Sequence, residues 1–269
     1  MARPDIRKNV RRGVYIVPTL FTVFNLFFGF RSIINSTRGI SAIAQHRPDL
    51  AVQFFEVACL SLLIAAVFDT FDGLVARALS ATSEFGKEYD SLADVVTFGC
   101  APAVLVYAWG LHVLGNLGGG IAFVFLVAGS LRLARFNVMT GKTDYRYFVG
   151  LPIPAGALTI AAIIFYAPSP VTDERFAYVM LIVTAAVAFA MVSPIRYRSQ
   201  KGLNLNKERS LMYFVVFSVI VGIAFKWPRQ FLFIGAISYL ASGPLMRLWS
   251  IAFPSRKPPE DAPAAVEAH

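Results

Sequence analysis

The feature that most constrains this chain is a series of long apolar stretches. A helix needs roughly 20 apolar residues to cross the hydrocarbon core of a bilayer. Charged residues make up only 15% of the chain, whereas soluble domains carry about 25%. We therefore expect an all-α fold, a polytopic membrane bundle of about eight transmembrane helices, with residues 1–253 forming one membrane-embedded domain. The expected helices cover residues 14–30, 52–77, 88–111, 119–138, 150–168, 176–194, 211–226 and 229–251.

The basic residues predict how this bundle is oriented. The net charge of +9 does not indicate a nucleic-acid partner, because Lys and Arg lie in short runs between the apolar stretches, where they act as topology signals. Sixteen of them fall on the side of the N-terminus and six on the other side. We expect an integral protein of the cell (inner) membrane, with both termini cytoplasmic and a disordered tail over residues 254–269.

Four aspartates stand at the ends of the second and third apolar stretches. Asp69, Asp72 and Arg77 share one helical face, because they are spaced at i, i+3 and i+8. Asp90 and Asp94 share a face of the next helix, so two antiparallel helices would point four carboxylates at one another. Charges inside membrane helices cost on the order of 3 kcal/mol each, and they usually mark a functional site or a buried partner.

Four clustered anions need compensating cations if they share a site away from water. Oxygen ligands favour a hard ion, Mg²⁺ or Mn²⁺, and four carboxylates suit two such ions. Paired metal ions commonly support displacement at phosphorus. The other interpretation is a buried Asp–Arg network that only locks the helices together. Because Arg77 could neutralise only one of the four aspartates, we favour the metal site.

The pattern D-x2-D-G-x2-A-R-x8-G-x3-D-x3-D over residues 69–94 resembles the signature of the CDP-alcohol phosphotransferases at every specified position. The resemblance implies a bundle with six core helices, a cytoplasm-facing polar cavity, a CDP-activated substrate and a homodimer. The implied metal ligands are Asp69, Asp72, Asp90 and Asp94, with Asp94 also the general base. The implied contacts to the CDP lipid are Pro18, Thr19, Thr22, Asn25, Gly73, Arg77, Ser83 and Gly86.

Three further strings concern the acceptor alcohol. Residues 131–137 (LRLARFN), 150–156 (GLPIPAG) and 192–198 (VSPIRYR) resemble the integral-membrane phosphatidylserine synthases of that family. This likeness implies transfer of a phosphatidyl group from CDP-diacylglycerol to L-serine, with Arg132, Arg135 and Asn137 as candidate serine-binding residues. Arginine pairs well with a carboxylate.

The charge argument leaves other acceptors open. Glycerol phosphate and inositol phosphate would also need arginines, and Arg132 and Arg135 could instead anchor the helix or contact lipid headgroups. From a different class of protein, a divalent-cation transporter could use the four aspartates as an ion site. That reading leaves Arg77 and the glycines at 73 and 86 unexplained.

Overall fold

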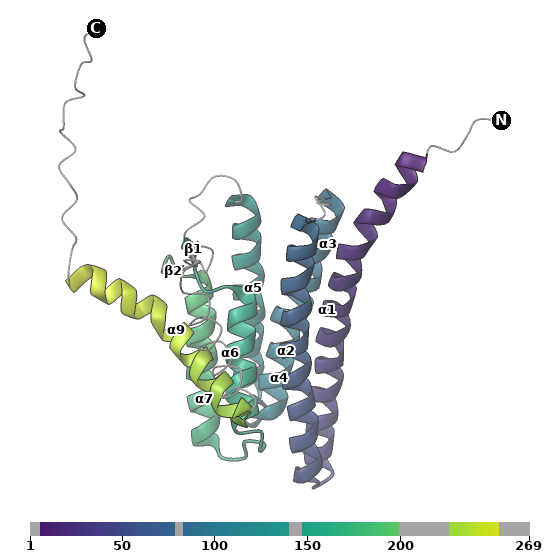
Figure 1. The fold of residues 1–269 in the computed structure, drawn as a ribbon. Helices are drawn as coiled ribbons and strands as arrows, with labels where there is room; N and C mark the ends of the chain where they lie inside the picture. Colours follow the sequence, from purple (N-terminus) through teal and green to yellow (C-terminus); the bar gives the residue numbers. More distant parts are fainter. Residues whose placement is uncertain (1–5, 79–82, 140–146, 199–225, 253–269) are drawn as a thin grey trace, which may run out of the picture.

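The computed structural model describes residues 6–78, 83–139, 147–198 and 226–252. They form a bundle of long helices that run alternately up and down, with α9 crossing the others obliquely (Figure 1). The helices are α1 (Ile6–Ala44), α2 (Pro48–Ala78), α3 (Glu84–Asp94), α4 (Ala101–Trp109), α5 (Asn116–Met139), α6 (Ile153–Tyr166), α7 (Glu174–Val192) and α9 (Pro228–Ala252). Two short turns, η1 (Val95–Cys100) and η2 (Leu111–Leu114), join neighbouring helices.

The all-α membrane class is confirmed. Among the described residues, four helical stretches are long and apolar enough to cross a membrane, namely Pro48–Val75, Glu84–Trp109, Asn116–Val138 and Glu174–Val192, and Ile153–Tyr166 is a shorter apolar helix. Seven of the eight expected segments are helical. The eighth, at 211–226, and the tail at 254–269 lie outside the described residues, so the count of eight and the tail's disorder stay predictions.

The first helix is longer than the sequence predicted. We expected a segment over 14–30, but α1 continues to Ala44. The extension remains helical because its polar side chains bond to their own helix. Asn35 Nδ2 donates to the Arg31 carbonyl at 2.8 Å, and Ser36 Oγ donates to the Ser32 carbonyl at 2.8 Å. A hydropathy profile does not show that such polar side chains form hydrogen bonds within their own helix.

The third expected segment is helical but not uniform. After Asp94 the chain takes a π-helical turn, η1, before α4 begins. Pro102 stands at the start of α4 and has no N–H to donate to the preceding turn. This missing donor accounts for the change in the backbone hydrogen-bond pattern of the helix. Single π-helical turns of this kind are frequent at functional sites.

A two-stranded antiparallel ribbon joins the end of α7 to the start of α6 and is a small addition to the helical bundle. Strand β1 (Tyr147–Val149) pairs with β2 (Arg196–Arg198), with Phe148 opposite Tyr197. Gly150 follows at φ +81°, and a Cβ there would overlap the Met191 carbonyl. The Gly150 N–H donates to the Ile195 carbonyl at 2.8 Å. A glycine is therefore required at this turn.

Helix α1 approaches the π-helical turn closely at Gly29. A Cβ at Gly29 would overlap Thr97, including its backbone. The Thr97 hydroxyl donates to the Asn25 carbonyl at 3.3 Å across the same contact. The glycine thus sets the distance between α1 and the helix that carries Asp94.

Replacing Gly29 by Ala should lower the free energy of unfolding by about 1–3 kcal/mol, because an overpacked contact must shift its backbone. Thermal unfolding of the purified protein in detergent measures the effect. Gly120→Ala is the matched control, since a Cβ there meets open space. Equal unfolding midpoints for the two variants would contradict this account of the contact.

Candidate active site

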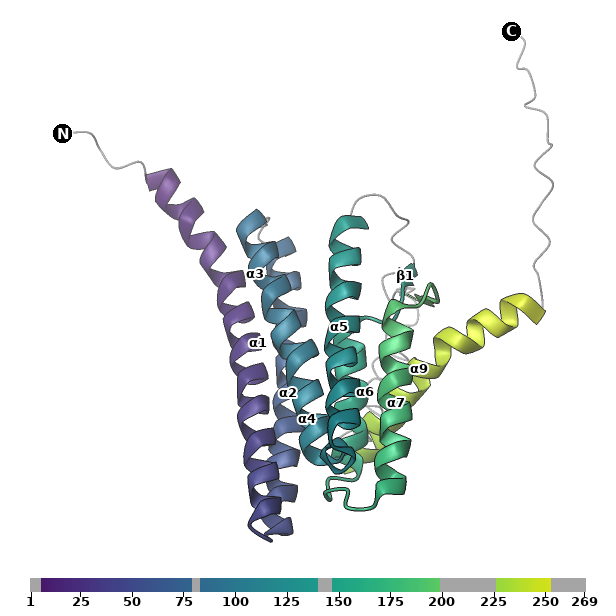
Figure 2. The ribbon, with the colours of Figure 1, turned by 180° about the vertical axis from the view of Figure 1, so that it is seen from behind.

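Three of the four aspartates lie together where α2 and α3 face each other. Asp69, Asp72 and Asp90 each offer a carboxylate oxygen, and these oxygens lie within 4.8 Å of one another. Asp72 is buried, while Asp69 and Asp90 are half-buried. In two opposite views this end of α2 and the whole of α3 lie at the end of the bundle that also carries β1 and β2 (Figures 1 and 2).

Asp94 lies beside this cluster of three rather than within it. Its charge interacts with those of Asp69, Asp90 and Asp72, and its side chain is only 8% exposed. The amide Nδ2 of Asn25 donates to Asp94 Oδ1 at 3.3 Å. The fourth aspartate thus lies immediately before the π-helical turn, where it bonds to Asn25 of α1 and also to Asp69 of the cluster.

Helix α1 also contacts the cluster one turn earlier. Thr22 Oγ1 donates to Asp72 Oδ2 at 3.3 Å. Thr22 and Asn25 are both buried, and their spacing of three residues puts them on one helical face. The first-helix residues that the sequence singled out thus reach two of the four carboxylates directly.

The other residues expected to contact the CDP lipid have differing surroundings. Thr19 is half-buried on α1, and Gly73 is half-buried on α2 beside Asp72. The Ser83 hydroxyl accepts the Gly86 N–H at 3.0 Å and so caps the start of α3. Pro18 and Arg77 lie in α1 and α2, but their side chains are outside the described residues.

The candidate acceptor residues on α5 fall into two groups. Arg132 is 7% exposed, interacts with the charge of Asp94, and lies over the Phe136 ring at 5.4 Å from the ring centre. Its Nε is buried without a hydrogen-bond partner in the described part of the chain. Arg135 and Asn137 are exposed instead, and they bond to the Val192 carbonyl (3.2 Å) and the Ser91 hydroxyl (2.9 Å). Of these three residues, only Arg132 combines a buried donor that has no partner among the described residues with a charge interaction with Asp94.

The cluster of three aspartates could hold a divalent metal ion. Its oxygens are close enough to share an ion, and carboxylates are suitable ligands for Mg²⁺ or Mn²⁺. Among the described residues, Asp90 Oδ1 is buried with no hydrogen-bond partner. Coordination of this oxygen to a metal ion would compensate for the missing hydrogen bond. The residues therefore fit a metal site, whereas the number of ions and the preference for Mg²⁺ or Mn²⁺ stay predictions.

Fold and site together define a helical membrane protein with a carboxylate cluster at one end of its bundle. The profile of the CDP-alcohol phosphatidyltransferase family matches residues 15–192, which include all four aspartates. The chain belongs to this family.

Proteins with curated names extend the likeness beyond the matched region. A CDP-diacylglycerol–serine O-phosphatidyltransferase of Helicobacter pylori is 31% identical over 237 residues, which cover 86% of this chain and 90% of that protein. The archaetidylserine synthase of Methanothermobacter thermautotrophicus is 35% identical over 70% of this chain and 71% of its own. A CDP-diacylglycerol–serine O-phosphatidyltransferase of Bacillus subtilis is 31% identical over 67% of this chain and 89% of its own.

Sequence reasoning missed two side chains beside the site. Thr97, buried in the π-helical turn, ties that turn to the Asn25 carbonyl. Tyr239, on α9, lies within electrostatic range of Arg132. Thr97 lies three residues after Asp94, and a polar residue so close to the motif was the only available signal. Nothing in the spacing of Tyr239 links it to a residue on α5.

Proposed function

We propose that this protein transfers the phosphatidyl group of CDP-diacylglycerol to the hydroxyl of L-serine, giving phosphatidylserine and CMP. Family membership supports the chemistry, and relatives at 31–35% identity that are named for serine support the acceptor. The observation that carries the proposal is the buried Arg132, whose Nε has no hydrogen-bond partner among the described residues and whose charge interacts with that of Asp94. A cation so placed suits an acceptor that brings a carboxylate next to the base.

The four aspartates have two roles in the proposed reaction. Asp94 takes the proton from the serine hydroxyl as the serine oxygen attacks the phosphorus that carries the diacylglycerol. The bond from that phosphorus to the CMP oxygen breaks, and CMP leaves with the electron pair. Asp69, Asp72 and Asp90 would hold the divalent cation, which would neutralise negative charge on the pyrophosphate and on the departing CMP.

Neighbouring polar residues orient these carboxylates. The Asn25 amide fixes one oxygen of Asp94 and so presents the carboxylate in a single orientation. Thr22 does the same for Asp72. Arg132 compensates the charge of Asp94 and offers its free N–H to the serine carboxylate, a charge-assisted hydrogen bond.

The membrane arrangement follows from the charge distribution. We infer that both termini and the active site face the cytoplasm, since most Lys and Arg between the apolar stretches fall on that side. The acyl chains of the substrate then remain in the bilayer of the inner membrane while the CDP group enters at its cytoplasmic boundary. We also propose a homodimer, because the resemblance to the family implies one.

One assay tests the proposed function. Purified protein is given CDP-diacylglycerol, Mn²⁺ or Mg²⁺ and one of three acceptors: L-serine, glycerol 3-phosphate or inositol phosphate. We expect metal-dependent CMP release and a new phospholipid with serine, and little of either with the phosphorylated acceptors. Preference for a phosphorylated acceptor would replace serine within the same chemistry. Failure to release CMP with any acceptor would favour the cation transporter.

A further inference from the structure

Helix α9 lies beyond the matched family region, which ends at residue 192. It packs against α6, and its side chains Leu232 and Leu240 contact the buried core. At its start, Arg229 forms an ion pair with Glu56 of α2. Helix α9 therefore adds a wall beside α2 and α6 that the family region alone does not supply.

An apolar slot of about 230 Å³ lies between α2, α6 and α9. Most of its described lining is aliphatic or aromatic. The polar groups in that lining are the Cys59 thiol, the Tyr239 hydroxyl and the Thr159 hydroxyl, and the last is bonded to the Ala155 carbonyl at 2.8 Å. Leu60 in the same lining is 41% exposed, so the slot can be reached from the outer surface of the bundle. A lining of this kind suits a hydrocarbon chain rather than a polar ligand.

The position of the slot along α2 places it in one leaflet of the bilayer. Leu63 and Cys59 line the slot and lie six and ten residues before Asp69, which corresponds to about 9 and 15 Å along a helix that rises about 1.5 Å per residue. In the proposed function the carboxylates lie at the cytoplasmic boundary of a hydrocarbon core about 30 Å thick. The slot therefore lies in the cytoplasmic half of the core, which is the leaflet that holds the lipid substrate.

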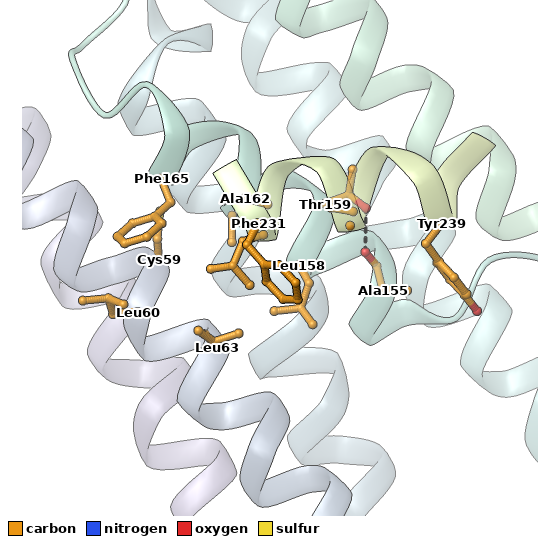
Figure 3. A pocket seen from close by; sticks show the side chains of 14 residues that line it. Cys59, Leu60, Leu63, Ala155, Leu158, Thr159, Ala162, Phe165, Phe231 and Tyr239 are labelled. Atoms are coloured by element: carbon orange, nitrogen blue, oxygen red, sulfur yellow. Dashed lines mark hydrogen bonds between the residues drawn. The ribbon is translucent and has the colours of Figure 1, made fainter. Parts of the chain in front are cut away.

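The slot has an apolar length and a charged end. Figure 3 shows Ala155 and Tyr239 at one end of the lining and Phe165 at the other. The ten residues of α6 from Ala155 to Phe165 rise about 15 Å, about half of the hydrocarbon core. At the Phe165 end, the Arg229 guanidinium lies over the ring, 5.5 Å from its centre, while it pairs with Glu56. Because charged groups are poor neighbours for hydrocarbon, a chain that enters near Tyr239 would stop at this ion pair.

We propose that the slot holds one acyl chain of CDP-diacylglycerol, so that α9 sets the chain length that the enzyme accepts. This inference rests on the proposed function for the identity of the lipid. A chain that moves from the bilayer into the slot gains little from the hydrophobic effect, because lipid tails are as apolar as the side chains of the lining. Selection between chains therefore depends on the room inside the slot, where an overfilled site is unfavourable.

Gly235 and Ala236 leave this room in the middle of α9. Gly235 lines the slot one turn after Phe231 and one turn before Tyr239, and a Cβ there would meet nothing within 4 Å. Gly235→Leu therefore fills open space, and leucine also favours a helix more than glycine does. Gly120→Leu is the matched control, since a Cβ at Gly120 of α5 also meets open space and Gly120 is outside the slot.

The dependence of CMP release on acyl-chain length tests the proposal. Purified variants receive L-serine and CDP-diacylglycerol with either dipalmitoyl or dioctanoyl chains. In Gly235→Leu, kcat/KM for the dipalmitoyl lipid should fall about 5- to 150-fold, which corresponds to the 1–3 kcal/mol cost of an overfilled site. The dioctanoyl lipid should be affected little, because its chains are too short to pass Gly235. Ala236→Leu should act in the same direction, and Gly120→Leu should change neither value. Equal losses with both lipids, or no loss in either slot variant, would overturn the proposal.

Photo-crosslinking identifies the occupant without turnover. CDP-diacylglycerol with a diazirine near the end of one acyl chain should label the slot-lining parts of α2, α6 or α9, and should label them much less in Gly235→Leu. Unlabelled CDP-diacylglycerol should prevent labelling, whereas phosphatidylglycerol with the same chains should not. Equal competition by both lipids would make the occupant a bilayer lipid and overturn the assignment. Labelling of the slot without CMP release to serine would contradict the proposed function alone, and CMP release without labelling would contradict this inference alone.

Discussion

Exchanging any one of the four site aspartates for asparagine should lower turnover by about 100-fold or more, while the protein still folds and inserts. Asparagine keeps the size of the side chain and removes the charge that both a metal ion and a general base require. The four variants are Asp69→Asn, Asp72→Asn, Asp90→Asn and Asp94→Asn. Initial rates of CMP release at saturating substrates measure the loss.

The geometry also predicts how the four variants differ. Asp69, Asp72 and Asp90 share the 4.8 Å cluster, so their variants should need more Mn²⁺ for half-maximal rate. Asp94 lies beside the cluster and bonds to Asn25, so Asp94→Asn should lower the rate with a smaller change in metal requirement. An equal shift in all four variants would make Asp94 a metal ligand of the same rank.

Thermal unfolding supplies a test that does not depend on activity. Without metal, clustered carboxylates repel one another, so each variant in the cluster should unfold at a higher temperature than the wild type in EDTA. Adding Mn²⁺ should stabilise the wild type more than the variants. Asp49→Asn is the control, since Asp49 is exposed in the first turn of α2, the helix that carries Asp69 and Asp72. Near-normal turnover in all four variants would end the metal-site hypothesis.

Helical periodicity explains why the aspartate positions could be predicted. Residues three, four and eight apart must share a face of any α-helix, so the spacing of Asp69 and Asp72, and of Asp90 and Asp94, determined that each pair faces one side. The sequence also places the two helices next to each other through a short connection. It could not show that Asp94 lies outside the closest cluster, because that depends on how α1 packs against both.

Contacts between helices that are distant in the sequence could not be predicted for a related reason. Arg132 and Arg135 are one turn apart on α5, and their sequence contexts are alike. Their different burial arises from packing: Arg132 is buried within electrostatic range of Asp94, whereas Arg135 is exposed and donates to the carbonyl of Val192 on α7. Tertiary packing decides which of the two arginines is buried, and no local sequence pattern encodes that packing.

The second large effect is expected at the acceptor. Arg132→Ala should raise the KM for serine about 10- to 150-fold, because a charge-assisted hydrogen bond is worth about 1.5–3 kcal/mol. The KM for CDP-diacylglycerol should change far less. Arg132→Lys should recover only part of the loss, since lysine keeps the charge and lacks the planar fork that pairs with a carboxylate.

Arg135→Ala is the matched control on the same helix. Its guanidinium is exposed and donates to a backbone carbonyl, so its removal should leave the serine KM nearly unchanged. From the sequence, the two arginines are equal candidates for binding serine, whereas in the structure their burial differs. A larger effect at Arg135 than at Arg132 would reverse the assignment.

Acceptor analogues separate carboxylate recognition from a change in the base. Arg132 also compensates the charge of Asp94, so its loss should lower kcat for every acceptor by a common factor. Carboxylate recognition concerns serine alone. Serine amide and ethanolamine, which lack the carboxylate, should therefore be poor substrates of the wild type, and their disadvantage relative to serine should shrink in Arg132→Ala. If ethanolamine matched serine in the wild type, or if only the lipid KM rose in the variant, Arg132 would be a phosphate contact and the choice of serine would rest on the relatives alone.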